Sequence, residues 1–579
     1  MKKHAYIFGL ALVIAFITAQ SFYYRLSKKA VTVIGKTVTL LPRHISVCAP
    51  PIIEDSLVAD IPPMRGWGNY SMKITTTSDS AQFYFNQGLS MYYAFHTIEA
   101  YASFTKAAKI DPACAMAWYG KALAMGPTIN YANDYKPSLT SYESASRSAA
   151  LTINCTPVEK DLINAIQQRY SDDSAISVKQ LRINYAGAMQ KVYEKYPHNA
   201  DVVTLYADAL LLLHPWDLYT HDFKPKPWTP RIRSLLEEAL VICPNHPGAN
   251  HYYIHTLEAS GTPELALRSA HVLDTLMPSV SHVTHMPSHI YIRTGYYQQG
   301  INNNNAAVAG YRASVKQYKP VADNEVLYEA HNIHLKVNCA QMGGAYKVAI
   351  DGAKELQGLV PSNYLKSKAA DGNFFQYLYV QPLITNVRFG KWDEVLNTRV
   401  NEELPYASLL QHFSRGMAYC AKGNTVKAKA ELNKLERKIQ DKVLKSPLDN
   451  FSSAYEASYV ARLILQGVLA SAEKQDVKAI EYLQKAVTAE DNLIYNEPRD
   501  WPLPTRHYLA DVLIKAGKYD QAIAVLNKDL FINPNNGWAL TGLQLACQGT
   551  KNAPELEKVK MRLKSALKIS DVKIDRSVF

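Results

Sequence analysis

The sequence lacks the short motifs of several common enzyme classes. It has no C-x-x-C pair, no glycine-rich phosphate-binding loop, no G-x-S-x-G elbow and no H-E-x-x-H segment. These absences argue against a thioredoxin-like redox site, a cysteine zinc site, a nucleotide cofactor and the familiar serine-hydrolase and zinc-protease sites. Strand signals are also scarce, and residues 31–54 form the one extended-looking segment.

Long runs of like charge are absent as well. The formal net charge is +12, but the lysines and arginines are scattered and no run of five or more basic residues occurs. This pattern does not favour nucleic-acid binding. Apolar residues make up 47% of the chain and charged residues 20%, so a large core can form and nothing indicates global disorder.

The one marked apolar run lies at the N-terminus. It extends from Ala5 to Thr18 behind two lysines, and the small residue Ala19 follows it. This pattern predicts an export signal over residues 1–20, with a retained membrane anchor as the alternative, because the run is shorter than the roughly 20 residues of a spanning helix. We therefore expect a periplasmic protein, or one anchored in the inner membrane and facing the periplasm, with membrane contact only through this segment.

Cysteines are few, and an odd number of them is unusual in an exported chain. The seven cysteines leave at least one unpaired. Five fall within or at the ends of helical patterns, where a small buried thiol is the expected state. These five are Cys114, Cys243, Cys339, Cys420 and Cys547, whereas Cys48 and Cys155 lie outside the patterns.

What the sequence has instead is internal repetition. The segment AQFYFNQGLSMYYAFHTIEAYASFTKAAKIDPAC runs for 34 residues from Ala81, and LPTRHYLADVLIKAGKYDQAIAVLNKDLFINPNN repeats its pattern from Leu503. Small residues at positions 8 and 20 allow two antiparallel helices to approach closely, and a proline at position 32 ends the second helix. In the first copy these are Gly88, Ala100 and Pro112.

These signature positions resemble those of the tetratricopeptide repeat family. The resemblance covers nearly all of residues 78–570, with irregular inserts near 130–200 and 214–232. It implies an all-α, right-handed superhelical solenoid of about ten helical hairpins with a concave groove. We divide the chain into an N-terminal extended or linker segment 21–77, an N-terminal repeat pair with irregular helices 78–200, central repeats 201–365 and C-terminal repeats 366–579.

The central repeats place histidines in one register. In this family, side chains at positions 2, 5, 9 and 12 of each first helix face the groove. Histidines occupy such positions on three consecutive first helices, so they are predicted to share one groove, with His251 beside His285 and His255 beside His289. The full set is His251, His255, His282, His285, His289, His331 and His334.

Three interpretations of this set remain open. The first is a transition-metal site, since imidazoles one helical turn apart suit Zn, Cu or Fe. The second is a metal-free groove for a protein, a peptide or a small ligand, with Asp208, Asn332 and Arg293 as further polar groups. The third is purely structural. Glu258, at position 12 of the first of these helices, is the candidate general base if the site is catalytic.

One residue complicates the register. Pro287 lies between His285 and His289 and has no backbone N–H, so its helix must kink or start late. Either outcome rotates His282 and His285 relative to His289. A proline-rich and aromatic insert, HPWDLYTHDFKPKPW from His214, is expected to cover one end of the groove.

Beyond the repeat family, the combination of HPGANHYYIHTLEAS, HVTHMPSHIYIRTG, HNIH and NEPRDWPLP resembles a bacterial group of exported tetratricopeptide proteins. This resemblance implies the fold and a histidine-rich middle, and it implies no activity.

Overall fold

The computed structural model describes residues 60–132, 135–319, 326–448 and 451–579. Their regular structure is helical and includes no β-strand, only an isolated bridge between Tyr219 and Pro225. The predicted all-α fold is therefore confirmed. The predicted export signal, the extended segment 31–54 and Cys48 lie outside the described residues. No helix in the described ranges combines the length and apolarity that membrane crossing requires.

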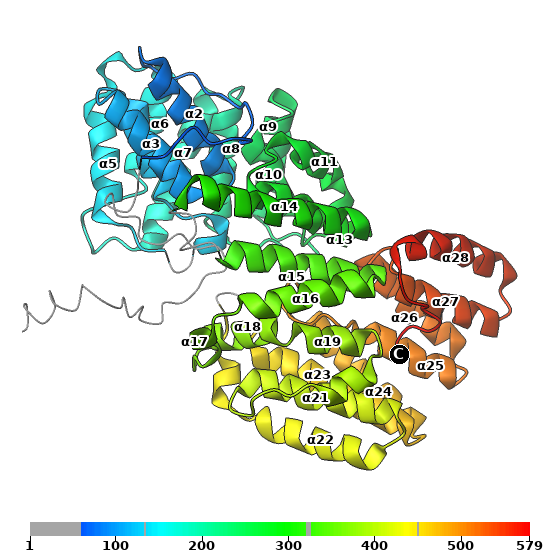
Figure 1. The fold of residues 1–579 in the computed structure, drawn as a ribbon. Helices are drawn as coiled ribbons and strands as arrows, with labels where there is room; N and C mark the ends of the chain where they lie inside the picture. Colours follow the sequence, from blue (N-terminus) through cyan, green and yellow to red (C-terminus); the bar gives the residue numbers. More distant parts are fainter. Residues whose placement is uncertain (1–59, 133–134, 320–325, 449–450) are drawn as a thin grey trace, which may run out of the picture. The chain divides into compact units, whose positions relative to one another are not determined.

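Successive helices pack against each other as hairpins along the chain (Figure 1). The N-terminal helices are α2 (Asp79–Tyr93), α3 (Thr97–Ile110), α4 (Ala115–Ala124), α5 (Leu139–Ala150), α6 (Pro157–Gln167), α7 (Val178–Lys195), α8 (Ala200–Leu211) and α9 (Thr229–Ile242). The central helices are α10 (Pro247–Leu257), α11 (Leu267–Leu276), α12 (Ser281–His285), α13 (Pro287–Thr294), α14 (Tyr297–Gln317), α15 (Val326–Gly343) and α16 (Tyr346–Leu359).

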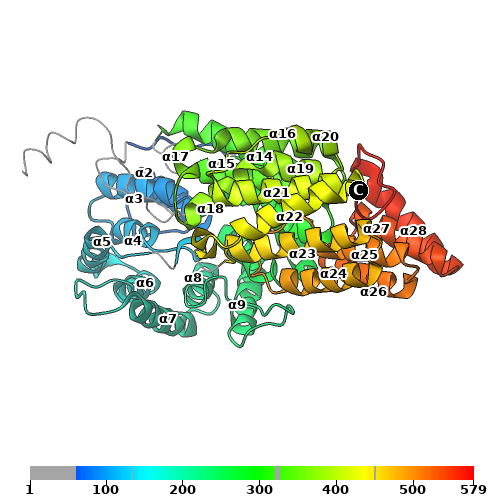
Figure 2. The same cartoon turned by 90° about the horizontal axis from the view of Figure 1, so that it is seen from below.

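The C-terminal helices continue the same arrangement (Figure 2). They are α17 (Ser362–Leu365), α18 (Ala370–Tyr379), α19 (Gln381–Arg388), α20 (Trp392–Asn397), α21 (Pro405–Ala421), α22 (Thr425–Lys438), α23 (Ala454–Ala472), α24 (Asp476–Asp491), α25 (Thr505–Lys515), α26 (Tyr519–Ile532), α27 (Gly537–Gly549) and α28 (Ala553–Ala566). Short 3₁₀ turns occur at Ile129–Tyr131, Thr152–Asn154, Pro263–Ala266, Lys442–Lys445 and Leu567–Ile569.

The small residues of the repeat signature allow the close approach of the helices. A Cβ atom at Gly88 would lie 2.9 Å from the ring of Phe104, and one at Gly120 would lie 2.2 Å from the same ring. Phe104 therefore fills the space that two glycines leave in the seam between α2, α3 and α4. Gly517 ends α25 with a φ of +71°, a left-handed conformation that lets the chain turn sharply into α26.

The two inserts differ in structure. Residues 130–200 form the helices α5, α6 and α7, and α6 starts with a capping box in which Thr156 and Glu159 satisfy each other's backbone N–H groups. The second insert remains irregular between α8 and α9. Ahead of α2, the extended residues are held along that helix, because the Met64 and Ile74 N–H groups donate to glutamine side chains on it.

The helical array closes on itself. The Trp538 indole on α27 donates to the Gln341 carbonyl on α15 at 2.9 Å, and the Tyr297 hydroxyl on α14 donates to the Pro534 carbonyl at 2.7 Å. Loops that follow α8, the 3₁₀ turn Lys442–Lys445 and α24 lie against the central histidines. The central histidines, predicted to face a concave groove with one end covered, lie in a covered interior.

The six described cysteines are free thiols. Cys114, Cys339, Cys420 and Cys547 are buried, and Cys243 is half-buried. This agrees with the prediction of small buried thiols in the helical patterns.

Candidate metal centre

Four helices bring the central histidines together. The helix α10 presents two of them one turn apart, α12 carries two more, and α13 and α15 each contribute one. All are buried except the half-buried ring on α15. The six are His251 and His255, His282 and His285, His289, and His331.

Pro287 decides how these side chains are distributed. The first helix of this repeat is interrupted, so that α12 ends at His285 and α13 begins at Pro287. Met286 between them keeps a helical backbone, with φ −51° and ψ −38°. The helix is thus interrupted at Pro287 as predicted, but the interruption is slight, because Met286 retains helical dihedrals and donates to the His282 carbonyl. All three histidines of this stretch still face the interior, with His282 in one group and the other two in a second group.

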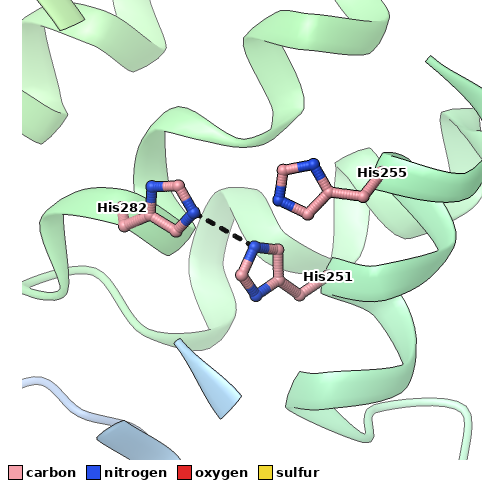
Figure 3. Close-up of side chains that lie close together, drawn as sticks. All are labelled: His251, His255 and His282. Carbon is pink, nitrogen blue, oxygen red and sulfur yellow. Dashed lines mark hydrogen bonds between the residues drawn. The ribbon is translucent and has the colours of Figure 1, made fainter. Parts of the chain in front are cut away.

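The first group, called triad A, consists of His251, His255 and His282 (Figure 3). One nitrogen of each ring lies within 4.8 Å of the corresponding nitrogen of the other two. The Nε2 atoms of His251 and His282 are 3.2 Å apart. The Nε2 atom of His255 is buried and has no hydrogen-bond partner. Triad A therefore has three converging imidazoles, one of which presents an unsatisfied nitrogen.

The second group, triad B, consists of His285, His289 and His331. Its ligand nitrogens also lie within 4.8 Å of one another. The Nε2 atom of His285 is 2.7 Å from Nε2 of His289 and 3.0 Å from Nε2 of His331. Around a tetrahedral ion with metal–nitrogen bonds of about 2.0–2.1 Å, ligand nitrogens are separated by roughly 3.3 Å. The His285–His331 separation is about 0.3 Å shorter than this value and the His285–His289 separation about 0.6 Å shorter, so the rings would have to move apart slightly to hold an ion.

Glu258 connects the two triads. Its Oε1 atom lies 2.7 Å from Nδ1 of His255 and its Oε2 atom 2.6 Å from Nδ1 of His289. Glu258 itself is 1% exposed. A carboxylate only accepts hydrogen bonds, so both Nδ1 atoms carry hydrogens and both Nε2 atoms present lone pairs. Carboxylates orient metal-binding histidines in this way.

Two other rings are fixed in the same tautomer. Nδ1 of His251 lies 2.7 Å from the Tyr93 carbonyl oxygen, and Nδ1 of His285 lies 2.7 Å from Oδ1 of Asn304. The Asn304 amide is oriented by its own Nδ2, which donates to the Gly300 carbonyl at 2.7 Å. The Nδ1 atoms of both rings thus donate outward, and their Nε2 atoms are left with lone pairs pointing into the triads.

This arrangement has a consequence for triad B. The facing Nε2 atoms of His285 and His289 are both acceptors, because their hydrogens are on Nδ1. When both rings are neutral these two lone pairs lie 2.7 Å apart and repel each other, and either a proton on His289, whose pKa Glu258 raises, or a metal ion relieves that repulsion. A metal ion satisfies all three nitrogens of the triad at once, whereas a proton satisfies only two of them.

Burial keeps most of these rings neutral. It lowers the pKa of His251, His282 and His285 well below the usual value, and the neighbouring histidines lower it further. For His289 burial acts in the same direction, but the Glu258 carboxylate outweighs it and raises the pKa. Burial also acts to raise the pKa of Glu258, yet the adjacent histidines bring it down to about 2. Neutral imidazoles held by an ionised carboxylate are the form that binds metals.

Two aromatic residues enclose triad A. The ring centroid of Phe95 is 4.4 Å from His251, 5.8 Å from His255 and 5.6 Å from His282. Trp216 lies edge-on to His255 at 5.4 Å. Both aromatics adopt left-handed backbone conformations, with φ of 59° and 61°. Bulky residues rarely do so, and such strained positions cluster at functional sites.

One cavity adjoins the central histidines, and a larger cavity adjoins the first. The smaller, about 80 Å³, is lined by His255 and His282 of triad A and by His289 and His331 of triad B. Apolar side chains close its far side, including Tyr377. The larger, about 700 Å³, lies between the insert after α8 and the segment after α24. Both cavities are lined by Trp216, Asn496 and Asp500, so the larger one adjoins the smaller at these residues.

The other predicted residues lie around this centre in different roles. His334 lines the small cavity but belongs to neither triad, and burial lowers its pKa to about 3. Asn332 donates to the Ser281 hydroxyl. Arg293 donates to three backbone carbonyls, among them that of Glu258 at 3.1 Å. Asn332 and Arg293 therefore support the helices that carry the triads.

The predicted lateral pairing of the repeats is correct for one pair only. His255 and His289 are neighbours, with ring centroids 6.2 Å apart and Glu258 between them. His251, however, pairs with His282 instead of His285. The interruption at Pro287 explains this difference, because His282 and His285 lie on their own short helix.

Asp208 is buried away from the triads and accepts a hydrogen bond from the Tyr92 hydroxyl at 3.0 Å. Burial raises the pKa of Asp208 to about 6 from an ordinary value of 3.8, although Arg169 opposes the shift. The folded state therefore holds a proton that the unfolded state releases, and stability falls as the pH rises from about 4 to 6.

We expect Asp208→Asn to remove this penalty. Urea denaturation should show a gain of about 3 kcal/mol in the free energy of unfolding at pH 8, and little change at pH 4. Asp201→Asn is the matched control. Asp201 is also buried, but the His246 ring 3.3 Å away and hydrogen bonds from the Tyr93 and Tyr70 hydroxyls overcome the effect of burial and lower its pKa, so its substitution should destabilise at pH 8. Equal changes in the free energy of unfolding for the two variants at pH 8 would contradict the raised pKa of Asp208.

Several residues of the centre were not predicted from the sequence. Glu497 lines the small cavity with its carboxylate buried and without a hydrogen-bond partner, and burial raises its pKa. It lies in the NEPRDWPLP stretch, for which the sequence predicted no role. Phe95 and Asn304 lie at repeat positions that carry no histidine. Tyr93 contributes through its backbone carbonyl oxygen, which accepts a hydrogen bond from His251. The only available signal was the unusual NEPRDWPLP stretch.

No protein-family model matches the chain, and no curated protein does. Among solved structures, it is similar to a human IFIT1 dimer with m7Gppp-AAAA, with TM-score 0.30, 14% identity, and 86% of this chain and 92% of that chain covered. It is also similar to yeast Tom70, with TM-score 0.26, 12% identity and coverages of 84% and 93%. The P58(IPK) TPR domain has TM-score 0.20, 12% identity and coverages of 84% and 99%.

At these TM-scores the similarities carry no argument about what this chain binds. The fold rests on the chain's own features, which are the 34-residue signature and the consecutive helix hairpins. The protein is a tetratricopeptide-like helical array whose interior holds a cluster of histidines.

Proposed function

We propose that this protein is an exported metalloprotein that binds a transition-metal ion through His285, His289 and His331. One observation carries the proposal: the Nε2 atoms of His285, His289 and His331 converge inside the protein, while Nδ1 of His285 and of His289 each face an acceptor outside the triad. Neutral rings in this arrangement offer their Nε2 lone pairs to one ion.

The donor set indicates the class of metal. Three imidazoles without a thiolate suit Zn, Cu, Fe or Ni, whereas Mg and Ca require oxygen ligands. No carboxylate is bound directly in this assignment, because both oxygens of Glu258 are engaged with Nδ1 atoms. We therefore assign Glu258 a positioning role in place of the general-base role that its sequence position indicated.

The geometry also leaves the ion open on one side. His289 and His331 line the small cavity, so a fourth coordination position there can take water or a small ligand. Three protein ligands with one open position are typical of catalytic metal sites, while structural sites are closed by four. Metal-dependent catalysis on a small substrate is the activity that this arrangement supports best.

Metal content tests the proposal. The untagged protein, loaded with Zn, Cu or Fe and passed through gel filtration, should retain at least one ion per chain by inductively coupled plasma mass spectrometry. His289→Ala should abolish binding at triad B. His334→Leu is the matched control, since this ring is equally buried, lines the same cavity and belongs to neither triad. Its metal content should be unchanged.

Less than about a tenth of an equivalent in the loaded wild-type protein would refute the proposal. The alternative function is then a metal-free scaffold that binds proteins or peptides in the cell envelope, which the tetratricopeptide-like fold favours. The proposed export is tested separately, by locating the protein in periplasmic, membrane and cytoplasmic fractions.

A further inference from the structure

We infer that triad A, formed by His251, His255 and His282, binds a second metal ion next to the first, so that the interior holds a two-metal centre. This inference rests on the proposed function of triad B and goes beyond it. It assigns a second ligand set, a common positioning residue and a shared open face.

The first argument is an unsatisfied nitrogen. Nε2 of His255 is buried, has no hydrogen-bond partner and points toward the other two rings of triad A (Figure 3). A buried polar atom left unpaired costs about 1–3 kcal/mol. Because Nδ1 of His255 donates to Glu258, its Nε2 carries a lone pair that only a donor or a cation can satisfy.

A second ring of triad A is poised in the same way. Nδ1 of His251 donates to the Tyr93 carbonyl, so its Nε2 also carries a lone pair. That atom lies 3.2 Å from Nε2 of His282. If His282 donated to it, the buried Nδ1 of His282 would remain unpaired. An ion between the three rings accepts the lone pairs of His251 and His255 together with one from His282.

The surroundings of triad A are those of a built site. Phe95 packs on all three rings and Trp216 on one, and both adopt a backbone conformation that bulky residues avoid. Strain of this kind persists only where the surrounding structure requires it. The two aromatics exclude water from the ligand nitrogens, which raises the strength of ligation.

The two triads form one centre. Glu258 holds one ligand of each, through His255 and His289. Rings of different triads are as close as rings within them: His282 and His285 have centroids 5.9 Å apart. The small cavity is lined by two ligands from each triad. A small molecule in that cavity of about 80 Å³ therefore contacts both ions at once.

The donor atoms and the cavity size indicate which ions and which small molecules this centre binds. Six neutral imidazoles select borderline transition-metal ions, and the cavity has room for a few waters or one small molecule. Glu497 also lines the cavity; its carboxylate is buried and accepts no hydrogen bond, and Nε of Arg499 lies 3.6 Å from its Oε1 atom. A pair of ions bridged by water or a small oxygen ligand fits this space.

Metal stoichiometry tests the inference. The wild-type protein, loaded with Cu²⁺ or Zn²⁺ and freed of excess metal, should contain two ions per chain by mass spectrometry. His282→Ala should lower this number, and His331→Ala, which alters triad B, should lower it as well. His334→Leu should still hold two ions. Circular dichroism on each variant confirms that the helices remain.

The possible outcomes separate the two claims. Two ions in the wild type, with a lower content in folded His282→Ala, support the two-metal centre. One ion in the wild type, or two ions that His282→Ala leaves in place, overturns the inference while the proposed function of triad B stands. No retained ion overturns both.

Discussion

Removal of metal by a chelator is expected to lower the melting temperature by on the order of 8 °C. When the free metal concentration is about a thousand times the Kd, one bound ion stabilises the folded state by about 4 kcal/mol and two ions stabilise it by about 8 kcal/mol. For a chain of this length, roughly 1 kcal/mol corresponds to about 1 °C in the melting temperature. The loss arises because the metal binds the folded state and not the unfolded one, so its removal takes away the binding free energy.

Thermal scans with and without chelator, followed by circular dichroism at 222 nm, measure this effect. Addition of Zn²⁺ or Cu²⁺ in excess of the chelator should restore the original melting temperature. A His282→Ala and His289→Ala double variant is the control, since both triads are altered and the chelator should have no effect. An unchanged melting temperature after complete loss of metal from the wild type would show that the triads contribute nothing to stability.

Glu258→Gln is expected to weaken metal binding by about 10–100-fold at one triad or both. A glutamine side chain has one accepting oxygen where the carboxylate has two. The Nδ1 atom of either His255 or His289 then faces an NH₂ group, and that ring must move its hydrogen to Nε2. A ring with its hydrogen on Nε2 has no lone pair at that atom with which to bind an ion.

Competition titration with a chromophoric chelator measures the affinity change. The matched control is Glu431→Gln. Glu431 also accepts a short hydrogen bond from a buried histidine, with its Oε2 atom 2.6 Å from Nδ1 of His412, but this pair lies on α21 and α22 away from the triads. Its substitution should leave both affinities unchanged. Wild-type affinity in Glu258→Gln would rule out the positioning role of this carboxylate.

The sequence predicted the helical array because its signals are local. Gly88 at position 8 and Phe104 at position 24 belong to one hairpin, and the structure packs them against each other. The same register predicted that the central histidines gather, and six of the seven do so in two triads. Periodicity along a helix is sufficient for both conclusions.

The sequence could not predict which histidines pair or what covers them. The partner of His251 depends on the helix interruption at Pro287, whose direction follows from packing and not from spacing. Trp216 and Glu497 come from segments outside the repeat pattern, more than 200 residues apart in the chain. Whether an array of repeats stays open or closes depends on the small rotation between each repeat and the next, added over many repeats. No local sequence pattern predicts this total rotation.

The closure of the array has a consequence for how the protein unfolds. Repeat proteins generally unfold piecewise, because each repeat contacts only its neighbours. Here Phe95 from the first hairpin packs on histidines of α10 and α12, and the turn before α27 is bonded to α13 and α14 through Arg293 and Tyr297. Ends that are hundreds of residues apart thus share one interior. Loss of any one of these elements exposes the same centre, so a nominally one-dimensional chain acquires the all-or-none cooperativity of a globular domain.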